Sequence, residues 1–433
     1  MIATRRLKQL LERPLQYGAA ESGSPYVDGV MVRYIRITDV DQSGRLRDRE
    51  PQYLPATLAV PYLLRRNDIL LARSGATVGK AFLYEGHDGD ASFAGYMIRA
   101  RVDPRVALPR FVYYCLQSDL YWDYVRSFYS QATIQNLNAQ LYGNVPIPLP
   151  SVIEQAALVE FLDRQTAAAN TLIAKYERLI ELLEEKRAAL VRHAVTEGLD
   201  DRVRLKDSGV EWIGSIPSHW RIVPLKYVVS IAGGSTPDKG NDDYWHGGEI
   251  PWASAKDLKV ETLLDTEDHI TELALRSGAV VIPEGCVITV VRGMILARTL
   301  PVAVTARAMV INQDLKALQP KRELRTEYLA DILRSISSAI LARADVAAHG
   351  TKVLRSEDWT RFEIPLPPLD EQDAIIASVA NQKEWFASLI GLAKKAIALI
   401  EERRSALVSA CVTGQVDVRS YGRQTRPSIE AAV

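Results

Sequence analysis

The chain has 433 residues, 53 Lys+Arg against 53 Asp+Glu, and 47% hydrophobic residues, which suits a globular protein of two or three domains. This composition excludes collagen, a coiled-coil rod, a disordered tail protein and a disulfide scaffold, and its neutrality disfavours a protein held to nucleic acid by bulk charge alone. Cys115, Cys286 and Cys411 lie far apart, which predicts reduced thiols and a cytoplasmic location. No segment is long and apolar enough to predict a membrane span.

Residues 1–150 alternate short β-type runs with turn signals, which predicts a mixed α/β domain. An aromatic, amphipathic stretch closes this region and predicts one helix over 109–129. The expected strands are 32–37, 68–72, 81–84 and 96–102.

A two-fold internal repeat organises the rest of the chain. The segment 147–200 reappears at 364–417 without a gap, with 21 of 54 positions identical. Ile147–Gln155 and Ile364–Gln372 share the pattern Ile-Pro-Leu-Pro followed by Glu-Gln. The regions before these segments match only faintly, so two similar segments keep one structural role while two variable segments can recognise different things.

The repeated segments, 151–200 and 364–417, predict long helices because they contain heptads of apolar residues and almost no helix breaker. The expected inward positions of the first helix are Leu158, Leu162, Ala169, Leu172, Tyr176, Leu179, Leu183 and Leu190. Gln165 and Gln382 fall at matching places in the two heptads, and we hypothesise that they fix the register of the helices.

The two helices are expected to form an antiparallel coiled coil, because a domain of about 150 residues between them lets the chain return. The alternative is that each helix packs on its own domain. The intervening residues 201–363 repeat the α/β plan, with a helix over 327–342, and 418–433 are expected to form a flexible tail. The predicted fold class is therefore α+β, with two tandem α/β domains separated by two long helices in a pseudo-two-fold repeat.

Motifs for catalysis or metal binding are weak. Gly75–Ala81 looks like a phosphate-binding loop, but it is one residue too short between its glycines and ends in Ala instead of Ser or Thr, so a tight turn is the better interpretation. Asp238, Asp257 and Lys259 fit a loose pattern of a metal-dependent nuclease. The six histidines are scattered without zinc-ligand spacing. We therefore expect no catalytic residue, no metal site and no cofactor.

The repeated motifs resemble the DNA-specificity subunit of type I restriction–modification systems. The resemblance rests on the two Ile-Pro-Leu-Pro openings, on the helix endings Glu184–Arg187 and Glu401–Arg404, and on the central segment Lys206–Trp220. It covers the chain to about residue 417. One departure is that the Trp212–Trp220 segment precedes only the second variable region, which leaves the start of the first domain uncertain.

The resemblance implies a non-catalytic subunit. Residues 1–150 and 201–363 would be target-recognition domains, each reading one half of a bipartite site in double-stranded DNA. The helices would set the spacing and dock modification (methyltransferase) subunits, two per chain, and a restriction subunit would join the same system. Methylation and cleavage would take place on those partner chains.

Loops rich in basic, amide and hydroxyl side chains suit base edges and phosphates, so they provide the candidate DNA contacts. In the first domain the candidates are Arg73, Ser74, Thr77, Lys80, Thr133, Gln135, Asn136 and Asn138. In the second domain they are Lys256, Arg292, Thr351, Lys352 and Arg355. Tyr96 and Trp252 are candidates for stacking on a base.

Two other functions remain open on the sequence alone. A duplicated protein-interaction scaffold without DNA contact fits the neutral charge. A standalone nuclease would use Asp238, Asp257 and Lys259.

Overall fold

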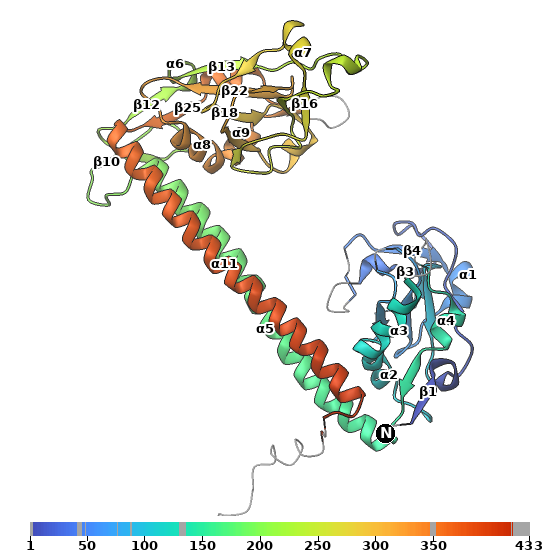
Figure 1. The fold of residues 1–433 in the computed structure, drawn as a ribbon. Helices are drawn as coiled ribbons and strands as arrows, with labels where there is room; N and C mark the ends of the chain where they lie inside the picture. The colour runs from blue at the N-terminus through green and yellow to red at the C-terminus, as the bar shows by residue number, and fades with distance from the viewer. Residues whose placement is uncertain are drawn as a thin grey trace, which may run out of the picture. The chain divides into compact units, whose positions relative to one another are not determined.

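The computed structural model describes all residues except 1–2, 41–45, 48, 76, 87–88, 130–135, 347–351, 417 and 419–433. It divides into two compact units, Met1–Arg178 with Ala393–Val433 and Leu179–Leu392 (Figure 1). Each unit holds one α/β domain and part of both long helices, α5 (Val152–Glu197) and α11 (Leu369–Val412).

The domain of the first unit is built on two small sheets, with strand orders β2-β8-β5-β6 and β4-β3-β7, and on the pair β1-β9. Its strands are β1 (Thr4–Arg6), β2 (Gln16–Tyr17), β3 (Met31–Ile35), β4 (Gln52–Pro55), β5 (Ile69–Ala72), β6 (Ala81–Leu83), β7 (Ala91–Phe93), β8 (Met97–Ala100) and β9 (Pro146–Pro148). Its helices are α1 (Ala56–Ala59), α2 (Pro109–Cys115), α3 (Asp119–Tyr129) and α4 (Ala139–Gly143), with 3-10 turns at Leu7–Leu10, Ile37–Asp39 and Val60–Tyr62.

The domain of the second unit repeats this plan with extra strands. Its main sheets have the orders β13-β22-β18-β20-β15 and β16-β14-β21-β17, beside the pairs β12-β25 and β10-β11 and the small sheet β19-β24-β23. Its strands are β10 (Leu205–Asp207), β11 (Ser215–Pro217), β12 (Arg221–Pro224), β13 (Val229–Gly233), β14 (Ile250–Ala253), β15 (Thr262–Leu263), β16 (Asp268–Ile270), β17 (Val281–Ile282), β18 (Val287–Val290), β19 (Arg292–Gly293), β20 (Val302–Thr305), β21 (Met309–Ile311), β22 (Leu315–Pro320), β23 (Asp345–Val346), β24 (Lys352–Val353) and β25 (Glu363–Leu366). Its helices are α6 (Leu225–Val228), α7 (Glu272–Arg276), α8 (Thr326–Ser335), α9 (Ser337–Leu341) and α10 (Ser356–Arg361), with 3-10 turns at Asp242–Tyr244 and Met294–Ala297.

The register of the strands shows that the two domains are copies. The pairing of Ile69 with Ala100 in β5 and β8 recurs as Val287 with Leu318 in β18 and β22. The parallel pair β3 and β7 likewise corresponds to β14 and β21. The faint sequence similarity between the variable regions therefore reflects one fold used twice.

The two helices run antiparallel as a coiled coil, as the sequence predicted. The core of the first unit combines the start of α5 with the end of α11, and the core of the second combines the end of α5 with the start of α11. In the first unit these residues include Leu158, Leu162, Val408 and Val412. In the second they include Val191, Val195, Ile375 and Val379.

Two of the eight predicted inward positions of α5 are wrong by one residue. Leu172 and Leu179 are 43% and 42% exposed, whereas Ile173 and Ile180 are partly buried. Gln165 is exposed as well, so it does not occupy the contact between the helices. Neighbouring apolar residues were equally suitable at these two places in the sequence, and packing selected the β-branched isoleucines.

Gln382 differs from Gln165 because its side chain is partly buried. Its Nε2 donates to the Ser378 hydroxyl at 3.3 Å, while its Oε1 is buried and has no hydrogen-bond partner among the described residues. Gln382 thus keeps the position that a register-fixing residue requires, and its role stays a prediction.

Two predicted helices are each divided in two. The segment 109–129 forms α2 and α3, separated at Leu116–Ser118, where the hydroxyl of Ser118 donates to the Cys115 carbonyl at 2.7 Å. The segment 327–342 forms α8 and α9, separated at Ile336. Side-chain hydroxyls that bond to the local backbone compete with helix continuation, which the apolar periodicity does not reveal.

A buried glutamine explains one part of the repeated motif. Gln155 is 0% exposed at the start of α5; its Oε1 accepts a hydrogen bond from the Leu108 amide at 2.8 Å and its Nε2 donates to the Pro150 carbonyl at 2.9 Å. The glutamine therefore ties the loop before α2 to the helix.

Gln372, its counterpart in the second copy, makes the same connections. It is 0% exposed, accepts from the Arg325 amide at 2.8 Å and donates to the Pro367 carbonyl at 2.9 Å. The repeated Glu-Gln pair thus keeps its glutamine because each domain is fastened to its long helix by this side chain.

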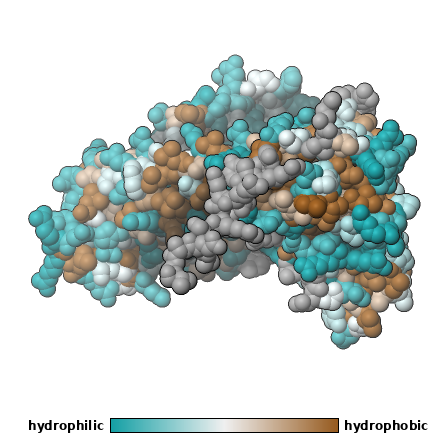
Figure 2. Space-filling view, turned by 90° about the horizontal axis from the view of Figure 1, so that it is seen from below, coloured by the Kyte–Doolittle hydropathy of each residue, from teal (hydrophilic) through white to brown (hydrophobic). Residues whose placement is uncertain are grey.

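Hydrophilic residues are interspersed with smaller hydrophobic patches on the face of the molecule in Figure 2. Such mixing is normal for a globular surface, where single exposed apolar residues are common. No helix among the described residues reaches the length and apolarity of a membrane span.

Candidate nucleic-acid interface

Four candidate residues of the first domain converge beside the end of β5. The Arg73 amide donates to the Tyr96 carbonyl at 2.9 Å, and the Arg73 carbonyl accepts from the Leu137 amide at 2.9 Å. Ser74 pairs with Asn136 in an antiparallel bridge. Arg73, Ser74, Tyr96 and Asn136 therefore come from three separate segments but form one cluster, and Tyr96 is 70% exposed within it.

Tyr17 also belongs to this cluster, although no pattern in the sequence pointed to it. The Arg73 guanidinium lies over its ring at 5.0 Å, and its hydroxyl accepts from the Ala139 amide at 3.0 Å. Tyr17 lies on β2, which reaches β5 only through β8. The only signal in the sequence is an aromatic residue on a short strand, and many buried positions share it.

Asn138 has a structural role. It is the N-cap of α4, and its side chain accepts a hydrogen bond from the Leu141 amide at 2.9 Å. This contact satisfies a helix-terminal amide that would otherwise lack a partner. Its side chain is exposed, and it lies two residues after Asn136, which belongs to the cluster.

The Gly75–Ala81 segment forms a tight turn between antiparallel strands β5 and β6, as expected, and Gly75 and Gly79 have positive φ. A Cβ on Gly79 would lie 2.9 Å from the Trp122 ring, so this end of the turn is packed closely against α3. Thr77 and Lys80 lie on this turn, and Lys80 is exposed.

Three candidates fall outside the residues that the structure describes. Thr133, Gln135 and Thr351 are not described. The described neighbours Asn136 and Lys352 fix where their segments enter the domains. Of the four candidates in the stretch 131–138, only Asn136 and Asn138 lie among the described residues.

The second domain presents different residues at the equivalent place. Arg292 pairs with Val353 in the register that Ser74 and Asn136 occupy in the first domain. Arg292 is exposed and the neighbouring Lys352 is partly buried. One backbone arrangement thus displays Ser74 and Asn136 in one copy and Arg292 and Val353 in the other, with Lys352 beside Val353.

Arg355 matches Asn138, because it is the N-cap of α10. Its Nε lies 2.7 Å from an Asp345 carboxylate oxygen. Both side chains are more than half exposed, so this surface ion pair contributes little stability and leaves Arg355 accessible.

Trp252 is not available to stack on a base. It is 4% exposed, packs edge-on against Trp245, and its Nε1 donates to the Ser235 carbonyl at 3.1 Å. Its counterpart in the register is Tyr34, which is also buried. The expectation failed because a central-strand tryptophan and an exposed one look alike in sequence.

Lys256 is exposed but its charge is compensated. Its Nζ lies 2.9 Å from carboxylate oxygens of both Glu267 and Asp268. These hydrogen bonds raise the pKa of the Lys256 ammonium. A phosphate would have to displace two carboxylates, so Lys256 is a poor backbone contact.

The Asp257 carboxylate, which a nuclease site would need, is already occupied by backbone hydrogen bonds. Asp257 accepts hydrogen bonds from the amides of Ser254 at 2.8 Å and Glu267 at 3.0 Å. Asp39 accepts from the Arg36 amide in the same way, so both aspartates cap a turn in the repeated fold. No group of three potential metal ligands occurs among the described residues.

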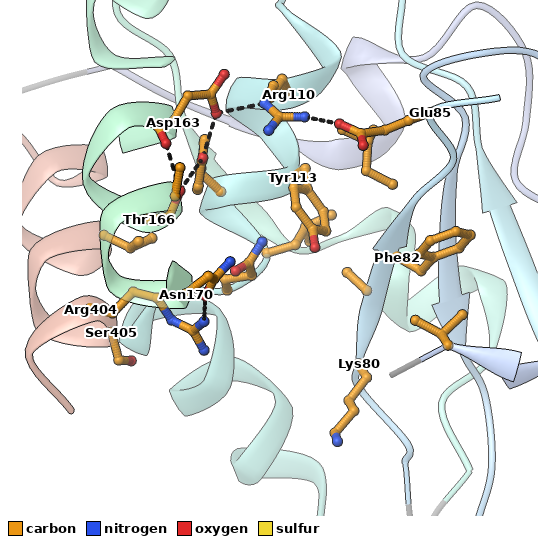
Figure 3. A pocket seen from close by; sticks show the side chains of 18 of the residues that line it. Lys80, Phe82, Glu85, Arg110, Tyr113, Asp163, Thr166, Asn170, Arg404 and Ser405 are labelled. Carbon is orange, nitrogen blue, oxygen red and sulfur yellow. Dashed lines mark hydrogen bonds and ion pairs between the residues drawn. The ribbon is translucent and has the colours of Figure 1, made fainter. Parts of the chain in front are cut away.

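A polar cavity of about 630 Å³ lies in the first unit between the α/β domain and the helices (Figure 3). Arg110 joins Asp163 of α5 to Glu85, and Arg404 of α11 donates to the Asn170 side chain at 2.6 Å. The Arg110–Asp163 contact attaches the domain to α5, and the Arg404–Asn170 contact joins α11 to α5.

Tyr114 completes that attachment. Its hydroxyl donates to Asp163 at 2.5 Å, and burial, followed by this hydrogen bond, raises the pKa of its phenol. In the second unit Asp331 stands at the position equivalent to Tyr114, and it accepts a hydrogen bond from Lys383 of α11 at 2.6 Å. Both residues attach a domain helix to a long helix, one through a tyrosine hydroxyl and the other through an ion pair.

Taken together, the geometry defines a duplicated α+β subunit whose two domains share a backbone, display different polar residues, and are fastened to an antiparallel helix pair. A family model described as the type I restriction modification DNA specificity domain matches residues 217–399. Over this segment the chain is similar to the specificity subunits of type I restriction–modification systems.

Relatives of known identity agree. The specificity subunit of the Escherichia coli enzymes EcoR124I and EcoR124II is 30% identical over 283 residues, and the match covers 63% of each chain. The MjaVIII specificity subunit of Methanocaldococcus jannaschii is 24% identical over 377 residues, covering 83% of this chain and 81% of that one. The chain thus spans a little under two thirds of the length of the E. coli relative.

Solved structures support the fold. A chain from a study of assembly and conformational transition of the type I R-M system has a TM-score of 0.70 at 18% identity, covering 96% of this chain and 98% of that one. The HsdS subunit of Thermoanaerobacter tengcongensis has a TM-score of 0.50 at 19% identity, covering 96% and 97%.

Proposed function

We propose that this chain is the sequence-specific DNA-recognition subunit of a type I restriction–modification complex. Residues 1–150 and 201–363 act as target-recognition domains, each reading one half of a bipartite site in double-stranded DNA. The observation that carries the proposal is the cluster beside β5 and β18, where one backbone arrangement displays Ser74 and Asn136 in one domain and Arg292 and Val353 in the other. A duplicated fold with unlike polar faces suits an asymmetric target.

The subunit is non-catalytic in this proposal, and methylation and cleavage belong to modification and restriction subunits. A cytoplasmic location is part of the same proposal, and the three free, buried cysteines support it. The saturated Asp257 carboxylate supports a structural role for the residues that resembled a nuclease site.

The long helices dock the modification subunits, two per chain. Trp385, Leu392 and Leu399 recur every seven residues along α11 and are 57%, 60% and 64% exposed. Leu182 of α5, the repeat counterpart of Leu399, is 45% exposed. An exposed apolar stripe at heptad spacing suits the packing of further helices against the pair.

The test is co-expression with the modification subunit of the same system in a host without other adenine methylation, followed by methylome sequencing. We expect methylated adenine in one bipartite motif with a fixed spacer. Methylation without a motif, or none despite a purified complex, would contradict the proposal. Residues 1–150 exchanged for the first domain of a relative serve as the control, because only one half of the motif should then change.

A further inference from the structure

Arg73 differs from the other candidate residues because its orientation is fixed from several sides. Both its backbone groups are hydrogen-bonded, to Tyr96 and Leu137. Its Nε donates to the Asn136 side chain at 3.3 Å, and its guanidinium lies 5.0 Å over the Tyr17 ring. A side chain restrained in this way loses little conformational entropy when it binds a ligand.

The charge of Arg73 is not neutralised by any described carboxylate. Two buried or half-buried arginines of the same domain are paired: Arg101 with Asp68 at 2.6 Å, and Arg110 with Asp163 at 2.6 Å. Tyr17 offers Arg73 a cation–π contact and no counter-charge. The arginine is therefore held in place yet keeps its capacity for an electronegative partner.

The terminal edge of the guanidinium is the part left for that partner. Asn136 occupies Nε, and the two terminal nitrogens have no acceptor among the described residues. This edge presents two parallel N–H donors, which match the O6 and N7 acceptors that guanine displays in the major groove. A phosphate would also accept these two N–H groups and a hydrogen bond from the Ser74 hydroxyl, so the substitutions below separate base from phosphate by their effect on the motif. The exposed Tyr96 ring offers a stacking surface, which suits a base.

The second domain has no such arginine. The Leu354 amide donates to the Val291 carbonyl as the Leu137 amide donates to the Arg73 carbonyl, so Val291 occupies the place of Arg73. Any function of Arg73 is therefore confined to the first domain.

We propose that Arg73 reads a guanine in the half-site recognised by the first domain, with Tyr17 and Asn136 as the residues that position it. This inference rests on the proposed function and adds the identity of one base. It predicts that at least one specified position of that half-site is a G·C pair.

The experiment uses the complex with the modification subunit and compares methylomes of the wild type, Arg73→Gln and Arg73→Lys. Glutamine pairs with the N6 and N7 of adenine, so Arg73→Gln should change the preference at one position from guanine to adenine. Arg73→Lys keeps the charge but loses the planar fork, and discrimination at that position should fall about 5- to 150-fold. A gain of adenine preference cannot result from misfolding.

Tyr17 and Lys80 provide the matched controls. Tyr17→Leu should relax the same position, whereas Tyr17→Phe, which keeps the ring under the guanidinium, should retain the selectivity. Lys80→Ala should weaken DNA binding equally for all sequences and leave the motif unchanged.

Three results would overturn the assignment of Arg73: a wild-type half-site without a specified G·C pair, a motif unchanged in Arg73→Gln, or equal loss at both half-sites. If the wild-type complex shows no motif at all, the proposed function fails instead. The two failures are therefore distinguishable, since the first leaves a bipartite motif in the wild-type methylome.

Discussion

At the residue scale, the repeated motif preserves attachment points. Gln155 and Gln372 each bond the loop that leads into a domain helix, and they are identical in both copies because no other side chain offers a donor and an acceptor at that distance. The sequence revealed that these glutamines matter but not why. Burial and partners on distant loops become visible only once the chain is folded.

Replacing Gln155 with Ala should lower the free energy of unfolding by about 1–3 kcal/mol, because the fully buried glutamine leaves a cavity and the partly buried Leu108 amide loses its partner. Chemical denaturation of the full chain measures the change. Gln165→Ala on the same helix is the control and should change the free energy by less than about 0.5 kcal/mol, since Gln165 is exposed. Equal effects of the two variants would contradict the attachment role.

At the element scale, the helices were predictable in length and direction, but not in two contact positions of α5. Heptad periodicity and the absence of breakers indicated 151–200 and 364–417, and α5 and α11 occupy most of those ranges. At Leu172-Ile173 and Leu179-Ile180 either neighbour could face inward, because both are apolar and adjacent to the predicted stripe. Only contacts with the second helix decide between them.

Gln382 offers a test of how the helix contact is specified. Gln382→Leu removes a buried, unpartnered carbonyl oxygen, so it should raise the free energy of unfolding by about 1 kcal/mol. If Gln382 also fixes the register, the leucine variant should populate additional oligomeric species. Thermal unfolding and light scattering measure the two effects.

Gln165→Leu, on the exposed side of α5, is the matched control and should do neither. A single species for Gln382→Leu would end the register hypothesis, whereas a lower stability would contradict the packing argument.

At the scale of the whole molecule, the neutral net charge hides an uneven distribution. Residues 1–150 hold 18 basic and 14 acidic side chains, a net of +4, within a chain of zero net charge. Several basic candidates, such as Lys256, are further neutralised by neighbouring carboxylates. Composition alone could show neutrality but not which charges face DNA.

The isolated chain should therefore bind its target only weakly, with a Kd of about 1 µM or above at 150 mM salt, because most phosphate attraction must come from partner subunits. Fluorescence anisotropy with target and scrambled duplexes measures the affinity. The assembled complex should bind the target at least about tenfold more tightly. Nanomolar, sequence-specific binding by the chain alone would refute this division of labour.

The length of the helix pair should determine the spacer of the target. Inserting seven residues after Ile180 in α5 and seven after Ala393 in α11, both ten residues from the Asn170–Arg404 contact, adds one heptad to each helix at matched places. One heptad lengthens a helix by about 10.5 Å, or about three base pairs. Methylome sequencing should show a spacer longer by that amount, while an unchanged spacer would rule out the ruler.

The sharing of one core by both ends of the chain has a consequence for gene architecture. Leu7 and Leu10, near the amino terminus, lie in the same hydrophobic cluster as Cys411 and Val412, near the end of α11. The first and last helical elements of the described chain thus pack together in one core. A circularly permuted gene that begins at residue 201 and joins 416 to 3 through a short linker should encode the same fold with the order of the two domains reversed. Conversely, deleting the last turn of α11 should unfold the domain encoded at the opposite end of the gene before it disturbs the nearer one.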